Sequence, residues 1–190
     1  ILSKAKELGN FVRVDMEDAS TTDATLRLYR EMQARHGNLG VVFQAYMRRT
    51  LSDIAALPET GANVRLCKGI YVEPRAIAFK AHETVRLNFL QALEKLFERG
   101  IYAGIATHDE HLVCGALGLI DRHRVPRERY EFQMLLGVEP ELRRILLAER
   151  HRLRVYVPYG RDWYPYSTRR LRENPEVAKH VVRAFLAGRT

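Results

Sequence analysis

The chain alternates short β-rich runs with segments of helical periodicity, and this alternation restricts its fold more than any other feature. Apolar residues recur at helical spacing in residues 25–35, 75–97, 111–120 and 140–149. Alternation of this kind predicts parallel strands joined by crossover helices, which is an α/β fold. The predicted strands, six in number, are residues 11–15, 40–46, 64–68, 101–108, 130–135 and 153–158.

Two α/β architectures compete, and the ends of the strands distinguish them. A doubly wound nucleotide-binding sheet usually carries G-x-G-x-x-G after its first strand, and the chain has neither that run nor a P-loop. In a TIM-type barrel the site is assembled from separate residues at the carboxyl ends of the strands. The predicted strands finish in such residues: Asp15, Gln44, Arg65 with Lys68, Thr107 with His108, Gln133, and Tyr156. A (βα)8 TIM-type barrel is therefore predicted.

The number of strands falls short of a complete barrel. Eight strands and about 250 residues are typical, whereas this chain has 190 residues and six readable strands. It opens in a helix-like segment, residues 1–8, and an open six-stranded sheet would expose two edges. We expect the first strands of the barrel to be missing from the chain and residues 1–190 to form a single domain, the C-terminal part of the barrel.

The net charge of +8 raises the question of an anionic partner. Arginine is concentrated in residues 122–129 and 143–154, but acidic residues interrupt both stretches and no aromatic residue separates the arginines. We therefore expect no nucleic-acid partner and favour solvated helix faces, with an anionic membrane surface or a phosphate-bearing cofactor as alternatives.

Other compositional signals exclude several classes of protein. No apolar run approaches the roughly 18 residues that a membrane span needs, and no signal peptide is visible. The spacing of Cys67 and Cys114 fits neither a disulfide framework nor a metal site, which is consistent with a reducing compartment. His108-Asp109-Glu110-His111 lacks the H-E-x-x-H spacing, so no metal is expected.

Residues 166–174 (YSTRRLREN) place two arginines next to a carboxylate. On a helix, Arg169, Arg170 and Glu173 would meet on one side, because residues three and four apart are neighbours. Arginine binds carboxylates bidentately, so this cluster suits a small ligand with a carboxylate and an ammonium group. A solvent-facing helix with internal ion pairs is the alternative.

Taken in order, the motifs resemble those of the proline dehydrogenase family of flavoenzymes. The matching segments are VDME (14–17), FQAY (43–46), RLCKGIY (65–71), ATH (106–108), FQML (132–135), VYVPYG (155–160) and RRLREN (169–174). The resemblance implies a distorted (βα)8 barrel that holds FAD at its mouth, with a last helix over the opening.

The resemblance also implies a substrate site. Arg169 and Arg170 match the pair that grips the carboxylate of L-proline, and Glu173 matches the glutamate that pairs with them. Tyr156 matches a tyrosine that packs near the substrate ring, and Leu135 matches a wall of the proline pocket.

The implied cofactor site lies along the strand ends. Arg65 matches the arginine beside the flavin N5, where a fixed cation would stabilise the charge that grows on the ring. Asp15 matches a carboxylate at the floor of the site, and orienting Arg65 is favoured over proton removal. The positions implied to contact flavin or phosphate are Met16, Gln44, Cys67, Lys68, Gly69, Thr107, His108 and Gln133.

Each of these residues also has a structural interpretation. Asp15 can cap a strand end or a helix, Arg65 and Lys68 can form salt bridges at the rim, and Gln44 can satisfy a backbone group. The chain departs from the family pattern at Ile70, where many members have alanine, and at Cys67, where many have valine. The family's substrate-contacting lysine lies on an earlier strand, which the chain lacks.

The implied function is oxidation of L-proline to 1-pyrroline-5-carboxylate by hydride transfer to FAD, with a membrane quinone as electron acceptor. The alternatives are a hydroxyproline dehydrogenase, suggested by Ile70, and a non-catalytic basic binding module. A cytoplasmic enzyme of bacterial type is expected, and peripheral association with the inner membrane and homo-oligomerisation stay open.

Overall fold

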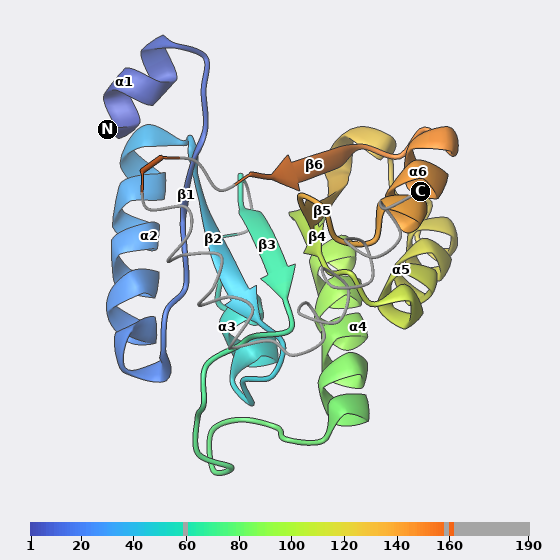
Figure 1. The fold of residues 1–190 in the computed structure, drawn as a ribbon. Coiled ribbons are helices and arrows are strands. Elements are labelled where there is room, and N and C mark those ends of the chain that lie inside the picture. Colours follow the sequence, from blue (N-terminus) through green and yellow to red (C-terminus); the bar gives the residue numbers. More distant parts are fainter. Residues whose placement is uncertain (59–60, 158–159, 162–190) are drawn as a thin grey trace.

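Six parallel strands form one curled sheet (Figure 1). The computed structural model describes residues 1–58, 61–157 and 160–161. Each strand pairs with the next one along the chain, in the order β1-β2-β3-β4-β5-β6. A doubly wound sheet reverses its strand order at a switch point, whereas a sequential order is that of a barrel wall. The strands are β1 (Val12–Val14), β2 (Leu39–Gln44), β3 (Asn63–Cys67), β4 (Tyr102–Ala106), β5 (Tyr130–Leu135) and β6 (Leu153–Tyr156).

The helices connect successive strands, as the alternation predicted. Their bounds are α1 (Leu2–Glu7), α2 (Thr22–His36), α3 (Thr50–Ala55), α4 (His82–Glu98), α5 (Glu110–Arg122) and α6 (Pro140–Ala148). Short 3-10 turns, Ala19–Thr21 and Arg127–Arg129, precede α2 and β5. Helix α3 was not predicted, because six residues are too few to establish a period.

The predicted start of the longest helix was wrong. Residues 75–81 are not helical, and α4 begins at His82. Ala78 instead forms an antiparallel bridge to Met47, and the Ile77 carbonyl accepts a hydrogen bond from the Arg48 amide at 3.0 Å. The apolar spacing that suggested a longer helix thus belongs to a segment pinned against the loop after β2.

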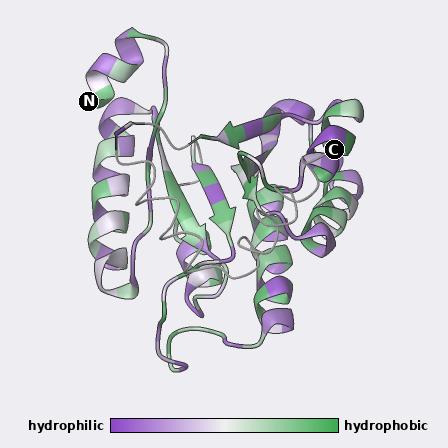
Figure 2. Ribbon diagram, viewed as in Figure 1, coloured by the Kyte–Doolittle hydropathy of each residue, from purple (hydrophilic) through white to green (hydrophobic). Residues whose placement is uncertain are grey.

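The face of the sheet that packs on the helices forms the core. Its side chains are at most 2% exposed: Val41, Phe43, Val64, Leu66, Ala103, Ile105, Phe132 and Met134. Phe89, Leu93 and Leu96 of α4 are fully buried. Figure 2 shows hydrophobic residues along β2 and β4 and over much of α4. Burial of this one face fixes the strand register, because a shift by one residue would turn every core side chain to the other side.

The opposite, inner face is polar. The register pairs Val42 with Arg65, Arg65 with Gly104, and Gly104 with Glu131, so these residues point the same way. Gln133 is likewise paired with Arg154. Arg65 and Gln133 therefore lie within their strands on the inner face, below the rim, and their predicted place at the strand ends was wrong.

Several arginines at the amino-terminal end of the sheet bind main-chain carbonyls. Arg99 donates to the carbonyl of Ile54 and, at 2.8 Å, to that of Leu57. Arg127 donates to the Glu149 carbonyl at 2.7 Å, and Arg129 donates to the Gly100 carbonyl. Part of the positive charge that was expected on solvated helix faces is thus used to satisfy carbonyls where helices end.

Candidate functional site

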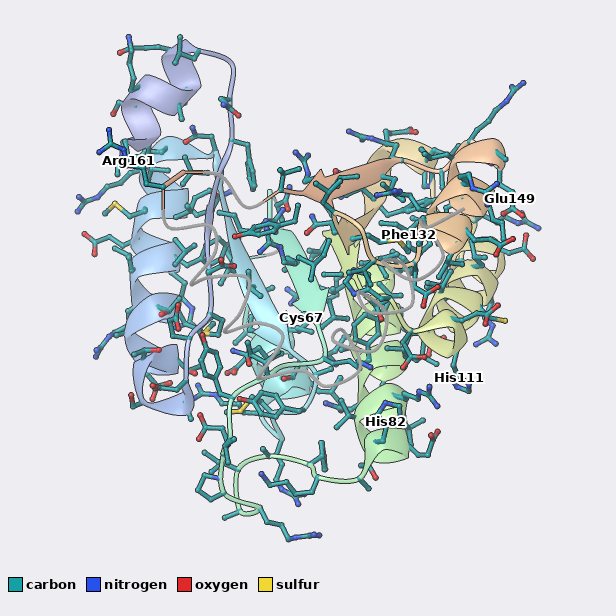
Figure 3. The ribbon with its side chains drawn as sticks, viewed as in Figure 1. Cys67, His82, His111, Phe132, Glu149 and Arg161 are labelled. Atoms are coloured by element: carbon teal, nitrogen blue, oxygen red, sulfur yellow. The ribbon has the colours of Figure 1, made fainter. Side chains whose placement is uncertain are left out.

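The carboxyl ends of the strands bring most of the predicted site residues to one rim. Asp15 follows β1, Gln44 ends β2, Cys67 ends β3, and Leu135 and Tyr156 end β5 and β6. The first turns of α4 and α5, marked by His82 and His111 in Figure 3, lie at this end of the sheet. Arg169, Arg170 and Glu173 lie outside the described residues.

Arg65 is held by two partners. Its Nη1 donates to Asp15 Oδ1 at 2.8 Å, and its Nε donates to Gln133 Oε1 at 2.8 Å. The Arg65 side chain is 22% exposed, whereas that of Asp15 is 63% exposed. Within the described part of the chain, Nη2 of Arg65 donates no hydrogen bond. The guanidinium is therefore held at two of its nitrogens, and Asp15 stands in the position that the orienting role requires.

Glu131 and Arg154 extend this network across β5 and β6, and the sequence analysis missed both. Glu131 Oε1 accepts from Arg154 Nε at 2.7 Å and from Gln133 Nε2 at 2.7 Å, and Oε2 accepts from Arg154 Nη2 at 3.0 Å. Burial alone would raise the pKa of Glu131, but the hydrogen bonds from Arg154 and Gln133 lower it. The carboxylate is thus ionised although its side chain is only 4% exposed. The sequence signal that could have found Glu131 was its position two residues before Gln133, which places both side chains on the same face of the strand.

Arg13 adds a further, half-buried cation to the inner face. Its Nη2 donates to Asn63 Oδ1 at 2.7 Å, and its Cζ lies 5.2 Å from the centroid of the Phe11 ring. Burial, followed by the charge of Arg65, lowers the pKa of Arg13 to about 10. Arg13 remains protonated at neutral pH, so the inner face is rich in fixed positive charge.

Gln44 supplies a test of whether the rim fits a flavin. Its Nε2 donates to the carbonyls of Met16 and Glu17 at 3.2 and 2.8 Å, which fixes the orientation of the amide. Its Oε1 is buried without a partner among the described residues. A buried acceptor left unpaired costs about 1–3 kcal/mol, so a ligand N–H would be stabilising there. The isoalloxazine ring of FAD carries such an N–H, and the residue therefore fits the cofactor.

The backbone at Gly69 approaches Tyr46 closely. Gly69 has φ +101, and a Cβ there would lie 2.2 Å from Tyr46 Cδ1. The Tyr46 amide donates to the Lys68 carbonyl at 2.8 Å. Burial raises the pKa of Tyr46. Only glycine permits this backbone shape beside the ring, so Gly69 shapes the rim without a side chain.

Cys67 is a neutral thiol at this rim. Its Sγ lies 3.5 Å from the Phe43 carbonyl oxygen, and burial raises its pKa to about 11. Since the thiolate is the nucleophilic form, Cys67 is unreactive near neutral pH. Its contribution is therefore shape and main-chain groups.

Lys68 belongs to a compact ion-pair cluster around Asp109. Asp109 Oδ2 lies 3.2 Å from Lys68 Nζ and 2.9 Å from Arg86 Nε, and the Asp109 side chain is 6% exposed. Burial would raise the pKa of Asp109, but the hydrogen bond from Arg86 and the charge of Lys68 lower it to about 2. The salt bridge considered for Lys68 is thus present, and two cations face one carboxylate.

Thr107 and His108 hold main-chain groups at the same end. Thr107 Oγ1 accepts from the Asp109 amide at 3.1 Å, and His108 Nε2 accepts from the Leu135 amide at 2.8 Å. Asp109 in turn caps α5 by accepting from the His111 amide at 3.2 Å. The start of α5, with its exposed positive dipole end, is therefore fixed beside Lys68.

Among the described helices, none combines the length and apolar character needed to cross a bilayer. In residues 1–58, 61–157 and 160–161, no group of three or more histidine, cysteine or acidic side chains is arranged to hold a metal ion.

Comparison with known proteins identifies the family. The sequence profile described as "Proline dehydrogenase" matches residues 1–183. The chain belongs to the proline dehydrogenase family. It is 39% identical over 190 residues to a proline dehydrogenase of Deinococcus radiodurans, covering 99% of the chain and 61% of that protein. It is 40% identical over 186 residues to proline dehydrogenase 1 of Bacillus subtilis subsp. natto, covering 98% of the chain and 62% of that protein.

Solved structures of proline dehydrogenase domains share the fold. Proline utilization A from Bdellovibrio bacteriovorus, inactivated by N-propargylglycine, superposes with a TM-score of 0.81 at 26% identity. The match covers 88% of this chain and 20% of that one. The chain spans about three fifths of the length of the two curated proline dehydrogenases. The six-stranded curled sheet thus corresponds to part of a proline dehydrogenase barrel.

Proposed function

We propose that the protein is an FAD-dependent dehydrogenase that oxidises L-proline to 1-pyrroline-5-carboxylate and passes the electrons to a membrane quinone. The observation that carries the proposal is the Arg65 guanidinium, fixed by Asp15 and Gln133 beside a rim that has an unsatisfied amide oxygen at Gln44. The proline dehydrogenases of Deinococcus and Bacillus support the substrate class.

Bound FAD would supply the hydride acceptor. The residues that would hold it are Gln44 through its free oxygen, Lys68 with the start of α5 for the phosphates, and Gly69 through its main chain. Met16, Cys67, Thr107 and His108 would complete the same edge. Arg65 would stand as a preorganised cation where negative charge develops, which is worth more in a water-excluded site than in water.

Substrate binding needs a carboxylate partner and an apolar wall. Leu135 and Tyr156 are paired across β5 and β6 and end at the same rim, which makes them neighbours in the wall. Arg169 and Arg170 would neutralise the carboxylate of proline, since a desolvated carboxylate is tolerated only when paired and hydrogen-bonded. Glu173 would orient that pair.

The reaction removes a hydride from C5 of proline and a proton from the ring nitrogen as the C=N bond forms. Asp15 binds Arg65 through Oδ1 and is largely exposed. We assign it the orienting role, with the substrate proton leaving to solvent.

The direct test is anaerobic titration of the purified protein with proline. Bleaching of the flavin absorbance, followed by reoxidation with a soluble quinone, is the expected result. A protein that binds no flavin, or holds flavin that proline does not reduce, would refute the proposal. Retention by anionic vesicles would test peripheral membrane association, and light scattering would give the oligomeric state.

A variant pair tests the substrate clamp. Arg170→Met should weaken proline binding by at least about tenfold, the worth of one charge-assisted hydrogen bond, while FAD stays bound. Arg172→Met, a neighbouring arginine with no assigned contact, is the matched control. Unchanged proline affinity in Arg170→Met would remove that residue from the site.

Ile70 bears on the choice between proline and hydroxyproline. Its side chain is 38% exposed at the loop that follows β3. Ile70 raised hydroxyproline as an alternative because it departs from the family pattern, but a side chain that narrows the pocket would disfavour hydroxyproline, which has one additional oxygen. Comparing kcat/KM for the two substrates in wild type and Ile70→Ala decides between the specificities, and faster turnover of hydroxyproline by the wild type would favour the alternative.

A further inference from the structure

We propose that Glu131 is a positioning residue for Arg65. Its buried carboxylate fixes the side-chain amide of Gln133, and that amide in turn fixes the guanidinium of Arg65. The proposal rests on the proposed function, because it explains how the cation assigned to the flavin site is held in place.

The amide of Gln133 can face Arg65 in only one orientation. Its oxygen must accept from Arg65 Nε, because an NH2 group in that place would face another donor. What selects this orientation is the other end of the amide, where Nε2 donates to Glu131 Oε1 at 2.7 Å. A carboxylate accepts and never donates when ionised, so it holds the NH2 group and leaves the oxygen for Arg65.

Arg154 keeps Glu131 both ionised and oriented. Its Nε and Nη2 bind the two carboxylate oxygens at 2.7 and 3.0 Å, a bidentate arrangement. Arg154 and Gln133 are partners in the β5–β6 register, so the sheet itself places both donors against the same carboxylate. The chain of contacts therefore runs from Arg154 through Glu131 and Gln133 to Arg65.

Gly104 makes room for this chain of contacts. It lies between Arg65 and Glu131 in the register, and a Cβ there would lie 2.5 Å from Gln133 Nε2. Such a contact is too short for a non-bonded carbon and nitrogen, so an alanine would displace the amide. The missing side chain of Gly104 thus allows Gln133 to lie across β4 and reach Arg65.

A purely structural role for Glu131, as counter-ion of Arg154, makes different predictions. In that case loss of the carboxylate would change stability without changing Arg65. The discriminating readout is therefore the Arg65 Nε–H itself, observed by 15N NMR in the flavin-free protein and assigned with an Arg65→Lys variant. The rate at which this proton exchanges with water reports its hydrogen bond to Gln133.

In Glu131→Gln, either orientation of the Gln133 amide finds a partner, so the Arg65 Nε–H should exchange about tenfold faster, as expected for loss of one hydrogen bond. The matched control is Glu94→Gln. It removes the carboxylate of α4 that pairs with Arg122 of α5. It should leave the Arg65 signal unchanged. An unchanged exchange rate in Glu131→Gln would overturn the proposal.

Gly104→Ala keeps the proposal testable if Glu131→Gln does not fold, since it moves Gln133 without altering any charge. The same acceleration is expected. In a Gln133→Ala background, adding Glu131→Gln should change the exchange rate less than twofold, because the connection is already broken. A full tenfold effect in that background would show that Glu131 acts by another route.

The flavin-loaded protein gives a second, separate readout. Glu131→Gln should shift the reduced-to-oxidised equilibrium of the flavin about tenfold toward oxidised, about 30 mV for a two-electron couple. Faster Nε–H exchange in a protein that binds no flavin would support the positioning role and refute the proposed function. Flavin binding and proline oxidation, with an unchanged exchange rate of the Arg65 Nε–H in Glu131→Gln, would support the proposed function and refute the positioning role.

Discussion

Arginines serve different purposes at the two ends of the sheet. At the amino-terminal end, Arg99, Arg127 and Arg129 donate to main-chain carbonyls near the ends of helices. On the inner face and at the carboxyl rim, Arg65 and Arg154 bind side-chain carboxylates or an amide. One residue type thus closes helix ends in one region and forms a charged, oriented network in the other.

The partners explain the difference. A main-chain carbonyl is neutral and is fixed by the fold. The arginine that binds it therefore stabilises the connection between a helix and the next strand and has no further role. A side-chain carboxylate carries charge and can be oriented, so the arginine that binds it gains a defined direction. The comparison predicts that removal of an arginine costs stability at the amino-terminal end and activity at the carboxyl rim.

The largest expected effect is that of Arg65→Met on turnover. We expect kcat with proline to fall by about 100-fold or more, the usual loss when one preorganised stabilising donor is removed. The free energy of unfolding should fall by about 1–3 kcal/mol, because the buried Gln133 Oε1 loses its donor, whereas Asp15 is largely exposed and returns to water. Steady-state kinetics and urea denaturation measure the two quantities. A large loss of stability with normal kcat would reverse the assignment.

Arg99→Met should show the opposite behaviour. The Leu57 carbonyl would lose its arginine donor in a half-buried place, and the Ile54 carbonyl would keep only main-chain donors, which together costs about 2 kcal/mol in free energy of unfolding. The kcat of the folded protein should stay within about twofold of wild type, since no rim residue is touched. Denaturation by urea, with kinetics on the same samples, checks both. Unchanged stability would mean that water replaces the guanidinium without cost.

Asp109→Asn should combine both kinds of effect, because Asp109 pairs with Lys68 at the rim and caps α5. Loss of charge-assisted hydrogen bonds should cost about 1.5 kcal/mol at pH 7. The folded pKa of Asp109, about 2, lies below the unfolded value of about 3.9. Its contribution to stability is therefore complete above the unfolded pKa and is lost as the pH falls from about 4 toward 2.

Unfolding free energies of wild type and Asp109→Asn, measured from pH 7 to pH 2, test this. The difference between the two proteins should shrink across that lower window. A difference that stays constant down to pH 2 would contradict the lowered pKa of Asp109.

The smallest effect is expected for Arg122→Ala. Arg122 lies at the amino-terminal end of the sheet, and its side chain is 70% exposed. Its Nη1 lies 3.3 Å from Glu94 Oε1, and among the described residues it has no main-chain partner. Exposed ion pairs of this kind contribute about 0.5 kcal/mol or less. A loss above about 1 kcal/mol in the free energy of unfolding, measured by urea denaturation, would show that an arginine's effect depends on its position in the sheet and not on its partner.

Some of the site was readable because polar residues stand where the apolar runs of the strands finish. Asp15, Gln44 and Lys68 follow or end apolar runs, and the parallel order of the strands was enough to place them on one rim. Glu131 was missed although it stands two residues before Gln133. A glutamate in an apolar run does not indicate whether a basic side chain on a neighbouring strand pairs with it. Its partner, Arg154, comes from a different strand and from a stretch that looked like a solvated basic surface.

The sequence by itself determined the alternation of strands and helices, the parallel sheet and the family, since these depend on local periodicity and on the order of motifs. Only the tertiary structure decided which arginines are paired and with what. It showed that Arg65 and Gln133 lie inside their strands, that Gly104 leaves space between them, and that Glu131 holds the Gln133 amide. The physical reason is that hydrogen bonds across neighbouring strands depend on register and side-chain direction, which no single stretch of sequence contains.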